Sequence, residues 1–242
     1  MSPGAARPRA ATLDRGDRVV HVRCSTRADG DFHLDGHSVV LEHRRQSFMP
    51  GRWTQLDEVH GSRVVEVLRP GDHDRAEGDA AVTACAGAVL AVWVGDCAPV
   101  VLVGDDGAVG VVHAGWRGAL DGVLQAAVKA MPSQRIEALL GPCIHPCCYE
   151  FGSDDLRTLT NRYGAAVAST TSWGSASLSM PAVVAAALSK RPLRGLRRTL
   201  QDALGPRAVE RAIDAGTSVV VGVNKFGDRT PIPAPPFSIV GR

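Results

Sequence analysis

The 242-residue sequence lacks any apolar run approaching the roughly 20 residues that a transmembrane helix needs. Residues 1–18 also lack the apolar stretch of a secretory signal, so we expect a cytoplasmic protein. An excess of one charge is missing too, because 27 basic and 25 acidic side chains leave a net charge of +2. This balance argues against nucleic acid or an anionic membrane as the main partner.

Cysteine makes up six of the 242 residues. In a chain without an export signal, the six cysteines are more typical of reduced thiols or metal ligands than of a disulfide framework. With 45% hydrophobic and 21% charged residues, the composition is that of a globular protein that can bury a core. We expect a flexible leader over residues 1–18, a main domain over 19–190, and an atypical basic, proline-rich segment over 191–242.

Hydrophobic patterning predicts the fold class. Three apolar runs, at 89–94, 100–103 and 109–112, predict strands buried on both faces, and residues 104–107 are typical of a hairpin turn. Apolar residues at helical spacing predict one amphipathic helix over 120–131. Further strands are predicted at 19–22, 64–68, 80–83 and 136–140, and a further helix at 180–188. The mixture favours an α+β fold with a mixed β-sheet core and flanking helices.

Three side chains that can bind a metal lie beside predicted buried strands: His60, Cys97 and His113. Side chains at strand ends can converge, and two imidazoles with one thiolate suit a zinc site whose fourth position is open to water. Such a site lowers the pKa of the bound water to about 7. Because the spacing is long and irregular, the residues alone favour three core side chains with structural hydrogen bonds over a metal site.

The glycine-rich segment after His113 suggests an anion site. Gly115 and Arg117 lie at the predicted N-terminus of the helix that runs to Met131. Free backbone amides, the helix dipole and a guanidinium there suit phosphate or another oxyanion. An equally good interpretation is that the glycines only permit a tight turn from strand to helix.

Three other segments favour structural interpretations. Cys143, His145, Cys147 and Cys148 place four possible ligands within one short stretch, but no second half of a zinc knuckle occurs elsewhere. A tight turn near the main site is therefore favoured over a separate metal site. The basic residues between 190 and 211 favour a solvated helix face over an anion-binding patch. The prolines of 231–236 exclude an interior strand or helix.

Five motifs occur in a fixed order along the chain. They are Val59-His60-Gly61, Gly78-Asp79-Ala80 with Val82-Thr83, Asp96-Cys97-Ala98-Pro99, His113-Ala114-Gly115-Trp116-Arg117-Gly118, and Gly141-Pro142 through Tyr149-Glu150. Together they resemble the YfiH-type family of laccase-domain proteins, also called multicopper polyphenol oxidoreductases, and the resemblance covers about residues 19–190.

The resemblance implies a fold shared with the cytotoxic necrotizing factor deamidases and a zinc site made by His60, Cys97 and His113. It also implies a purine nucleoside enzyme that phosphorolyses adenosine, inosine and methylthioadenosine and deaminates adenosine. Its partners would be a nucleoside and phosphate, and we expect a monomer or weak homo-oligomer. The family includes a peptidoglycan-editing factor as well.

Individual residues fit this implied chemistry. A metal-activated hydroxide suits attack on C6 of adenine. Arg117 suits phosphate, and Arg27, which matches the family's Thr-Arg motif, would supply a second positive charge. Asp96 is a candidate for proton transfer or ligand orientation, with a structural turn as the alternative.

The copper-oxidase label is not supported by the histidine count. A true multicopper oxidase needs about ten histidines for its mononuclear and three-copper centres, and the sequence has eight. We therefore expect Zn²⁺ as the cofactor, with copper entering the same site in vitro because its affinity for such ligands is higher.

The sequence departs from the family pattern in several places. Glu58 stands where Gln is usual and Gly95 where Ala is usual. The family's Cys-Thr pair and its serine-, tyrosine- and arginine-rich end, which close over the active site, are not found. Residues 209–240 are instead similar to a fragment of an acyl-CoA mutase large subunit.

Two alternative functions stay open. One is a Cys–His hydrolase or deamidase acting on an amide or peptidoglycan precursor, with Cys97 as nucleophile and His113 as base. The other is a non-catalytic remnant that binds a metal or a nucleotide.

Overall fold

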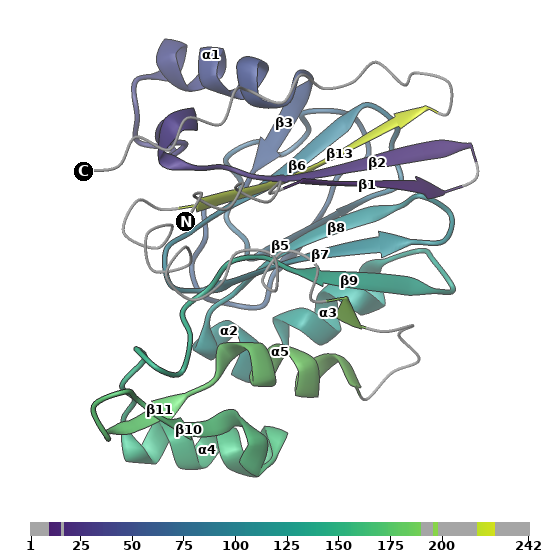
Figure 1. Cartoon of the computed structure of the whole chain (residues 1–242). Coiled ribbons are helices and arrows are strands. Elements are labelled where there is room, and N and C mark those ends of the chain that lie inside the picture. Colours follow the sequence, from purple (N-terminus) through teal and green to yellow (C-terminus); the bar gives the residue numbers. More distant parts are fainter. Residues whose placement is uncertain (1–9, 16, 190–195, 198–216, 226–242) are drawn as a thin grey trace, which may run out of the picture.

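Two β-sheets pack face to face at the centre of the protein, with helices on both outer faces (Figure 1). The computed structural model describes residues 10–15, 17–189, 196–197 and 217–225; for Arg27, 196–197 and 217–225 it describes the backbone alone. This arrangement confirms the predicted α+β class with a mixed β-sheet core and flanking helices.

The two sheets contain strands from both ends of the described chain. The strands are β1 (Ala10–Arg15), β2 (Arg18–Cys24), β3 (Arg52–Gln55), β4 (Val64–Glu66), β5 (Ala80–Thr83), β6 (Ala88–Val94), β7 (Ala98–Gly104), β8 (Val109–Ala114), β9 (Ile136–Leu140), β10 (Ala168–Thr170), β11 (Ala176–Leu178), β12 (Leu196–Arg197) and β13 (Thr217–Lys225). The first sheet has the order β1-β2-β13-β6-β3, and the second has the order β12-β9-β7-β8-β5-β4. β10 and β11 form a separate small hairpin.

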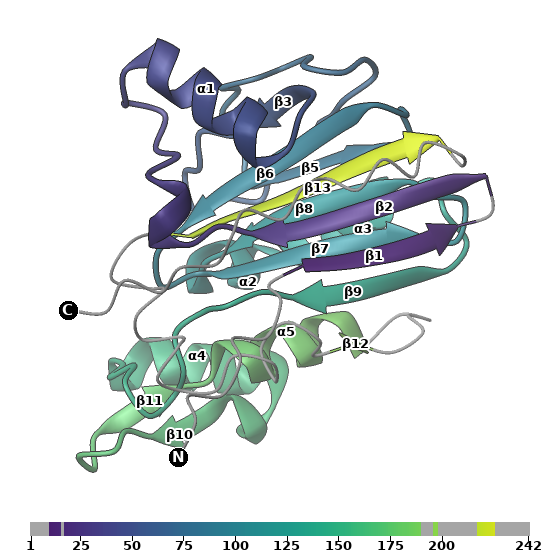
Figure 2. The ribbon, with the colours of Figure 1, turned by 45° about the horizontal axis from the view of Figure 1, so that its top comes forward.

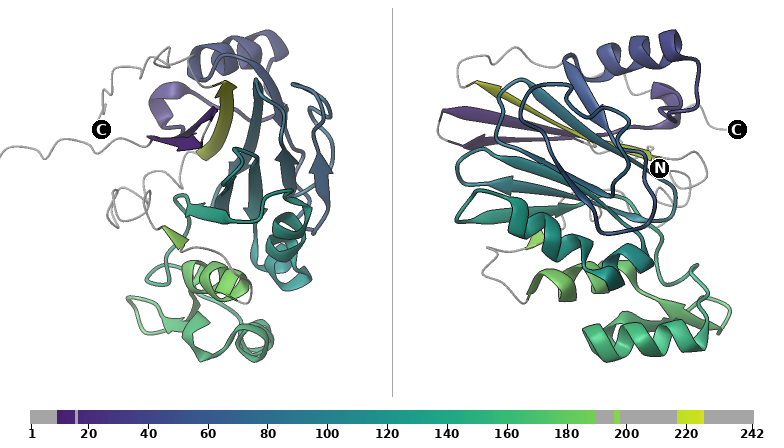
Figure 3. Two further views of the ribbon diagram at one scale, coloured as in Figure 1. Left: turned by 90° about the vertical axis from the view of Figure 1, so that its right-hand side faces the viewer. Right: turned by 180° about the vertical axis from the view of Figure 1, so that it is seen from behind.

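Helices cover the outer faces of the two large sheets, and one helix packs instead against another helix and the β10–β11 hairpin, away from the sheets (Figure 3). The helices are α1 (Ser38–Phe48), α2 (Trp116–Asp121), α3 (Val123–Ala130), α4 (Ser153–Tyr163) and α5 (Met180–Ser189), with single turns η1 (Arg27–Asp29) and η2 (Ala165–Val167). Within the described residues, none of these helices has the length and apolar character needed to cross a membrane.

Each interface between layers has its own apolar core. Val92 of the first sheet and Val101 and Val111 of the second belong to the cluster between the sheets. The opposite face of the second sheet packs on α2, α3 and α5 through a cluster that includes Val100 and Val112. The strands β6, β7 and β8 are therefore buried on both faces, as their continuous apolar runs predicted.

The predicted hairpin at residues 104–107 is confirmed. β7 and β8 pair antiparallel, with Val101 opposite Val111 and Ala98 opposite Ala114. The helix predicted over 120–131 is instead two helices, because Gly122 adopts a φ of 92° and ends α2 before α3 begins. Glycine occupies this left-handed conformation without the steric cost that a Cβ would bring.

Two segments outside the predicted main domain contribute strands. Ala10–Arg15, within the expected flexible leader, forms β1 and pairs along its length with β2. Within the atypical segment, β13 lies between β2 and β6 and pairs antiparallel with both (Figure 2). The backbone of 217–225 is therefore an interior part of the first sheet. The basic residues predicted to form a helix face at 190–211 lie outside the described residues, apart from the short β12, and so do the prolines of 231–236.

Candidate metal centre

His60, Cys97 and His113 converge at one end of the sheet sandwich. One potential ligand atom from each lies within 4.8 Å of the others. Cys97 Sγ is 3.7 Å from His60 Nε2, and the two imidazole rings cross at 81° with their centroids 4.8 Å apart. The structure thus brings together the three residues that the sequence predicted as one site.

The hairpin register explains why Cys97 lies beside His113. Ala98, the first residue of β7, is opposite Ala114, the last residue of β8. Cys97 and His113 each lie one residue from this pair, although they are distant along the sequence. His60 reaches the same place from the loop that follows β3 and leads to β4.

A buried carboxylate, Asp79, connects two of the three candidate ligands. One of its oxygens receives a 2.8 Å hydrogen bond from His113 Nδ1 and another of 2.8 Å from the His60 amide. The other oxygen accepts a hydrogen bond from the Gly61 amide at 2.8 Å. Because Nδ1 of His113 is occupied by Asp79, Nε2 is the nitrogen left for a metal. The same hydrogen bonds support His60 in the left-handed conformation, with φ at 60°.

Two glycines at the start of α2 make room for this arrangement, Gly115 as the residue before the helix and Gly118 within it. A Cβ on Gly115 would lie 2.8 Å from His60 Cδ2 and 3.2 Å from Cys97 Sγ, so a side chain here would displace the candidate ligands. A Cβ on Gly118 would lie 2.6 Å from the Gly61 carbonyl oxygen. The two glycines therefore do more than permit a turn, since they let α2 pack directly against the residues of the site.

The site perturbs the ionisation of its members. Burial alone would raise the pKa of Asp79, but the hydrogen bonds from His113 and from the Gly61 and His60 amides outweigh it and lower that pKa. Burial would lower the pKa of His113, but the hydrogen bonds to Asp79 and Cys97 raise it to about 10. Partial burial and the neighbouring His113 charge lower the pKa of His60. A metal ion requires both imidazoles to be neutral, so it would have to displace a proton from His113.

Arg117 and Tyr149 lie at the border of the candidate centre. The exposed Arg117 guanidinium stacks on the Trp116 ring, with 4.4 Å between Cζ and the ring centroid, and its charge helps to lower the pKa of His60. Burial and the negative charges of Cys97 and Asp96 raise the pKa of Tyr149 to about 12, so its phenol stays neutral. A positive charge and a neutral hydroxyl donor thus flank the three ligands.

The remaining predicted site residues have different placements. Asp96 is exposed next to Cys97, and the carboxylate that orients His113 is Asp79, not Asp96. Asp79 belongs to one of the family motifs, but the sequence did not indicate its role. The feature that could have identified it is an acidic residue directly before a buried strand, which begins at Ala80. The side chain of Arg27 lies outside the described part of the structure.

The cysteine-rich turn at 143–148 is not part of a metal-binding group. Among the described residues, His60, Cys97 and His113 form the single group of three or more potential ligands. All eight histidines lie in the described ranges, and two of them share this group. The arrangement is that of one metal position, in agreement with the histidine count that argues against a multicopper centre.

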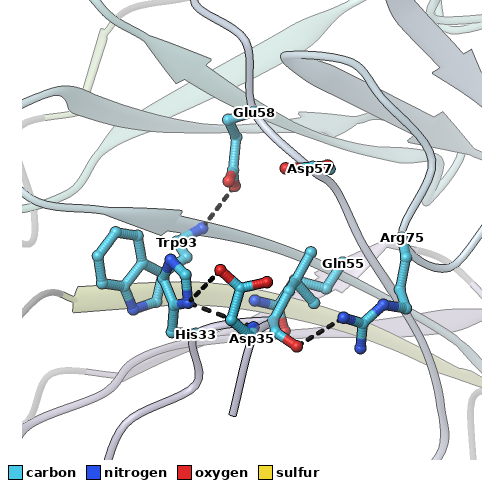
Figure 4. Close-up of a pocket in the computed structure, with 8 residues that line it drawn as sticks. His33, Asp35, Gln55, Asp57, Glu58, Arg75 and Trp93 are labelled. Atoms are coloured by element: carbon cyan, nitrogen blue, oxygen red, sulfur yellow. Dashed lines mark hydrogen bonds and ion pairs between the residues drawn. The ribbon is translucent and has the colours of Figure 1, made fainter.

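A small pocket is lined by residues that include Glu58, Arg75 and Trp93 (Figure 4). Burial raises the pKa of Glu58 to about 7. The 2.7 Å hydrogen bond from the Trp93 amide and the charge of His113 both act in the opposite direction and lower this pKa, but burial outweighs them. Within the pocket, His33 pairs with Asp35 and Arg75 donates a hydrogen bond to the Leu34 carbonyl. Its volume of about 180 Å³ is below that of typical small-molecule sites. The pocket therefore does not by itself define a substrate.

The fold and the site together define the class of this protein. It is an α+β protein with one candidate His-Cys-His metal centre at the end of a sandwich of two β-sheets. The family profile described as multi-copper polyphenol oxidoreductase laccase matches residues 30–200. The chain therefore belongs to this laccase-domain family, the YfiH-type family that its motifs resemble.

Curated relatives of this family carry an enzymatic name. A Xylella fastidiosa protein called purine nucleoside phosphorylase is 46% identical over 106 residues, which are 41% of this chain and 41% of that protein. A Streptomyces coelicolor protein of the same name is 36% identical over 148 residues, 58% of this chain and 61% of that protein. The chain thus matches less than two thirds of the length of these relatives.

Solved structures support the fold. A Neisseria meningitidis protein superposes with a TM-score of 0.69 at 20% identity, over 89% of this chain and 99% of that one. At such low identity the likeness concerns the fold alone.

Proposed function

We propose that this chain is a zinc-dependent purine nucleoside enzyme. Its reactions would be the phosphorolysis of adenosine, inosine and methylthioadenosine and the deamination of adenosine. The single observation that carries the proposal is the convergence of His60, Cys97 and His113 beside an exposed arginine, in a chain related to purine nucleoside phosphorylases.

The donor set fits zinc. Two imidazole nitrogens and one thiolate are ligands that zinc prefers, and three protein ligands leave one position of a tetrahedral ion for water. The 3.7 Å separation of Cys97 Sγ from His60 Nε2 agrees with two ligands of one ion, and Gly115 keeps that space clear of a side chain. When bound, zinc would supply a Lewis acid and a water of lowered pKa. Copper would enter the same ligands in vitro.

The chain's own residues would position the reactants. Asp79 fixes the ring of His113 and the backbone of His60. The two histidines are therefore held in place before a metal ion binds. The Arg117 guanidinium would hold phosphate, because a planar fork of donors matches the oxygens of an oxyanion. Asp96, exposed next to Cys97, would exchange protons with solvent during deamination. Arg27 would add a second positive charge for phosphate.

A product assay tests the proposal directly. Zinc-loaded protein incubated with adenosine should give adenine and ribose 1-phosphate when phosphate is present, and inosine when it is absent. The Cys97→Ser variant should lose both phosphorolysis and deamination. Cys85→Ser, which changes a cysteine away from the centre, should retain both reactions. Absence of both products from folded, zinc-loaded wild-type protein would refute the proposal.

A second candidate, a Cys–His hydrolase, is favoured by the contacts of Cys97. Its sulfur lies 3.7 Å from His60 Nε2, and its hydrogen bond to His113 contributes to the raised pKa of that ring. In this function Cys97 would attack an amide carbonyl and a histidine would take its proton. A thiol-specific probe should then label Cys97 even in zinc-saturated protein, whereas a zinc-bound thiolate is protected.

Tight binding of zinc or nucleoside without any turnover would instead identify a binding remnant.

A further inference from the structure

The cysteine-rich turn contains a second cluster of reactive side chains, outside the candidate metal centre. Cys147 and Cys148 are neighbours in the sequence, and their sulfur atoms are 2.9 Å apart. Both side chains are partly exposed, so small reagents can reach them. Among the described residues, neither belongs to the group that could hold a metal ion.

The local backbone holds the two thiols on one side of a turn. The Cys148 amide donates a hydrogen bond to the His145 carbonyl at 3.1 Å. The Cys147 carbonyl accepts two hydrogen bonds from Ser172, at 2.8 Å from the amide and 3.1 Å from the hydroxyl. These contacts hold both residues of the pair in the turn. In a regular strand, by contrast, the side chains of two adjacent residues would point to opposite faces and their sulfur atoms would not meet.

The turn is also connected to the candidate metal centre. The Ile144 amide donates a hydrogen bond to the Asp96 carbonyl at 3.0 Å, next to Cys97. On the other side of the pair, the Tyr149 ring packs edge-on against Phe151, which packs edge-on against Trp116 of α2. A change in the backbone at 147–148 would therefore be transmitted to residues that border the centre.

We propose that Cys147 and Cys148 form a redox-active vicinal dithiol, a modification site that a peroxide oxidises to a disulfide. One sulfur attacks a peroxide oxygen, the O–O bond breaks, and a sulfenic acid and water form. The second sulfur then displaces hydroxide from the sulfenic acid, so that the S–S bond forms as the S–O bond breaks and a second water leaves. Two electrons pass from the sulfurs to the peroxide, and no other reactant is needed.

The expected disulfide is a labile one. Consecutive Cα atoms are about 3.8 Å apart across a trans peptide, whereas disulfides usually join Cα atoms about 4.4–6.8 Å apart. Closing the bond must therefore distort the backbone between the two residues. Strained, accessible disulfides are reduced easily, which is typical of regulatory rather than structural bonds.

The test uses the full chain, reduced, loaded with zinc and then treated with hydrogen peroxide. Intact mass should fall by two hydrogens, and peptide mapping should place the new bond between Cys147 and Cys148. Brief treatment with a monothiol should restore the original mass. Cys85→Ser serves as the matched control and should behave as the wild type, because Cys85 is a partly exposed cysteine outside the pair. A bond mapped to any other cysteines, or peroxide addition without loss of hydrogens, would overturn the inference.

A second reagent tests the geometry without oxidation. Phenylarsine oxide forms two As–S bonds and releases water only when two thiols lie within reach of one arsenic atom. We expect one arsenic per reduced, zinc-loaded chain, with binding lost in both Cys147→Ser and Cys148→Ser. Arsenic retained by either variant would contradict the assignment. Both readouts are independent of enzyme activity, so they can succeed or fail separately from the proposed function.

Discussion

The buried carboxylate of Asp79 accepts a 2.8 Å hydrogen bond from Nδ1 of His113. The same carboxylate accepts hydrogen bonds from the backbone amides of His60 and Gly61. One acid thus fixes two candidate metal ligands that come from a loop and from a strand. This dual role makes Asp79 the natural residue with which to test the centre.

Asp79→Asn should weaken zinc binding about 10- to 100-fold, which is the usual effect of losing a residue that orients a metal ligand. The amide keeps the shape of the carboxylate but cannot accept hydrogen bonds at both of its ends. Competition with a chromophoric chelator measures the affinity. Asp96→Asn is the matched control, because it changes an exposed acid beside Cys97 that has no such contact with His113. Equal affinities for the two variants would contradict the role given to Asp79.

Gly115→Ala should abolish or strongly weaken zinc binding, because its Cβ would lie 2.8 Å from His60 and 3.2 Å from Cys97. Gly95→Ala is the control, since no atom lies within 4 Å of a Cβ at that position. Zinc content after purification and dialysis distinguishes the two variants, and circular dichroism checks that both are folded. The prediction fails if Gly115→Ala retains one zinc per chain.

Removal of zinc should destabilise the protein. A ligand present at about 100 times its Kd stabilises the native state by about 2.7 kcal/mol, which corresponds to roughly 5–10 °C in Tm for a domain of this size. Thermal melts with zinc and with a chelator measure the difference. His60→Ala should lose the zinc-dependent shift, whereas His43→Ala, at an exposed position on α1, should keep it. A shift of equal size in both variants would mean that zinc acts elsewhere.

Arg117→Gln should raise the KM for phosphate about tenfold, equivalent to about 1.4 kcal/mol, if this guanidinium holds the phosphate. The KM for adenosine in the deamination assay should change much less, because that reaction uses no phosphate. Arg157→Gln is the control, since Arg157 is exposed on α4 and pairs with Asp154. An unchanged KM for phosphate in Arg117→Gln would remove Arg117 from the proposed site.

A chain that ends before residue 217 should fail to fold cooperatively, because β2 and β6 would both lose the strand between them. Unpaired strand edges leave backbone amides and carbonyls unsatisfied and promote aggregation. A chain that ends at Lys225 keeps all of β13 and should melt as a cooperative unit. Soluble yield and thermal melting compare the two. A cooperative melt of the shorter chain would show that the sheet does not need β13.

Continuous or regular apolar patterns were the predictable part of the fold. The strands β6 and β7 are apolar along their whole length, β8 is apolar apart from His113, and the helix α5 matches its predicted range closely. The helix α1 was not predicted, because its buried face includes Arg45, which bonds to Asp74 and Gln55 and interrupts the apolar period. The helix α4 was missed since only Leu159 and Tyr163 of its residues are buried.

The amino-acid order by itself determined the candidate ligands, because imidazole and thiolate chemistry is a property of residue type and the motifs that contain His60, Cys97 and His113 are specific. Only the tertiary structure decided that these residues meet, through the register that sets Ala98 opposite Ala114. It also decided that Asp79 orients His113 and that β13 completes the first sheet. Such contacts join positions far apart in the chain, and no local pattern of hydrophobicity or charge encodes them.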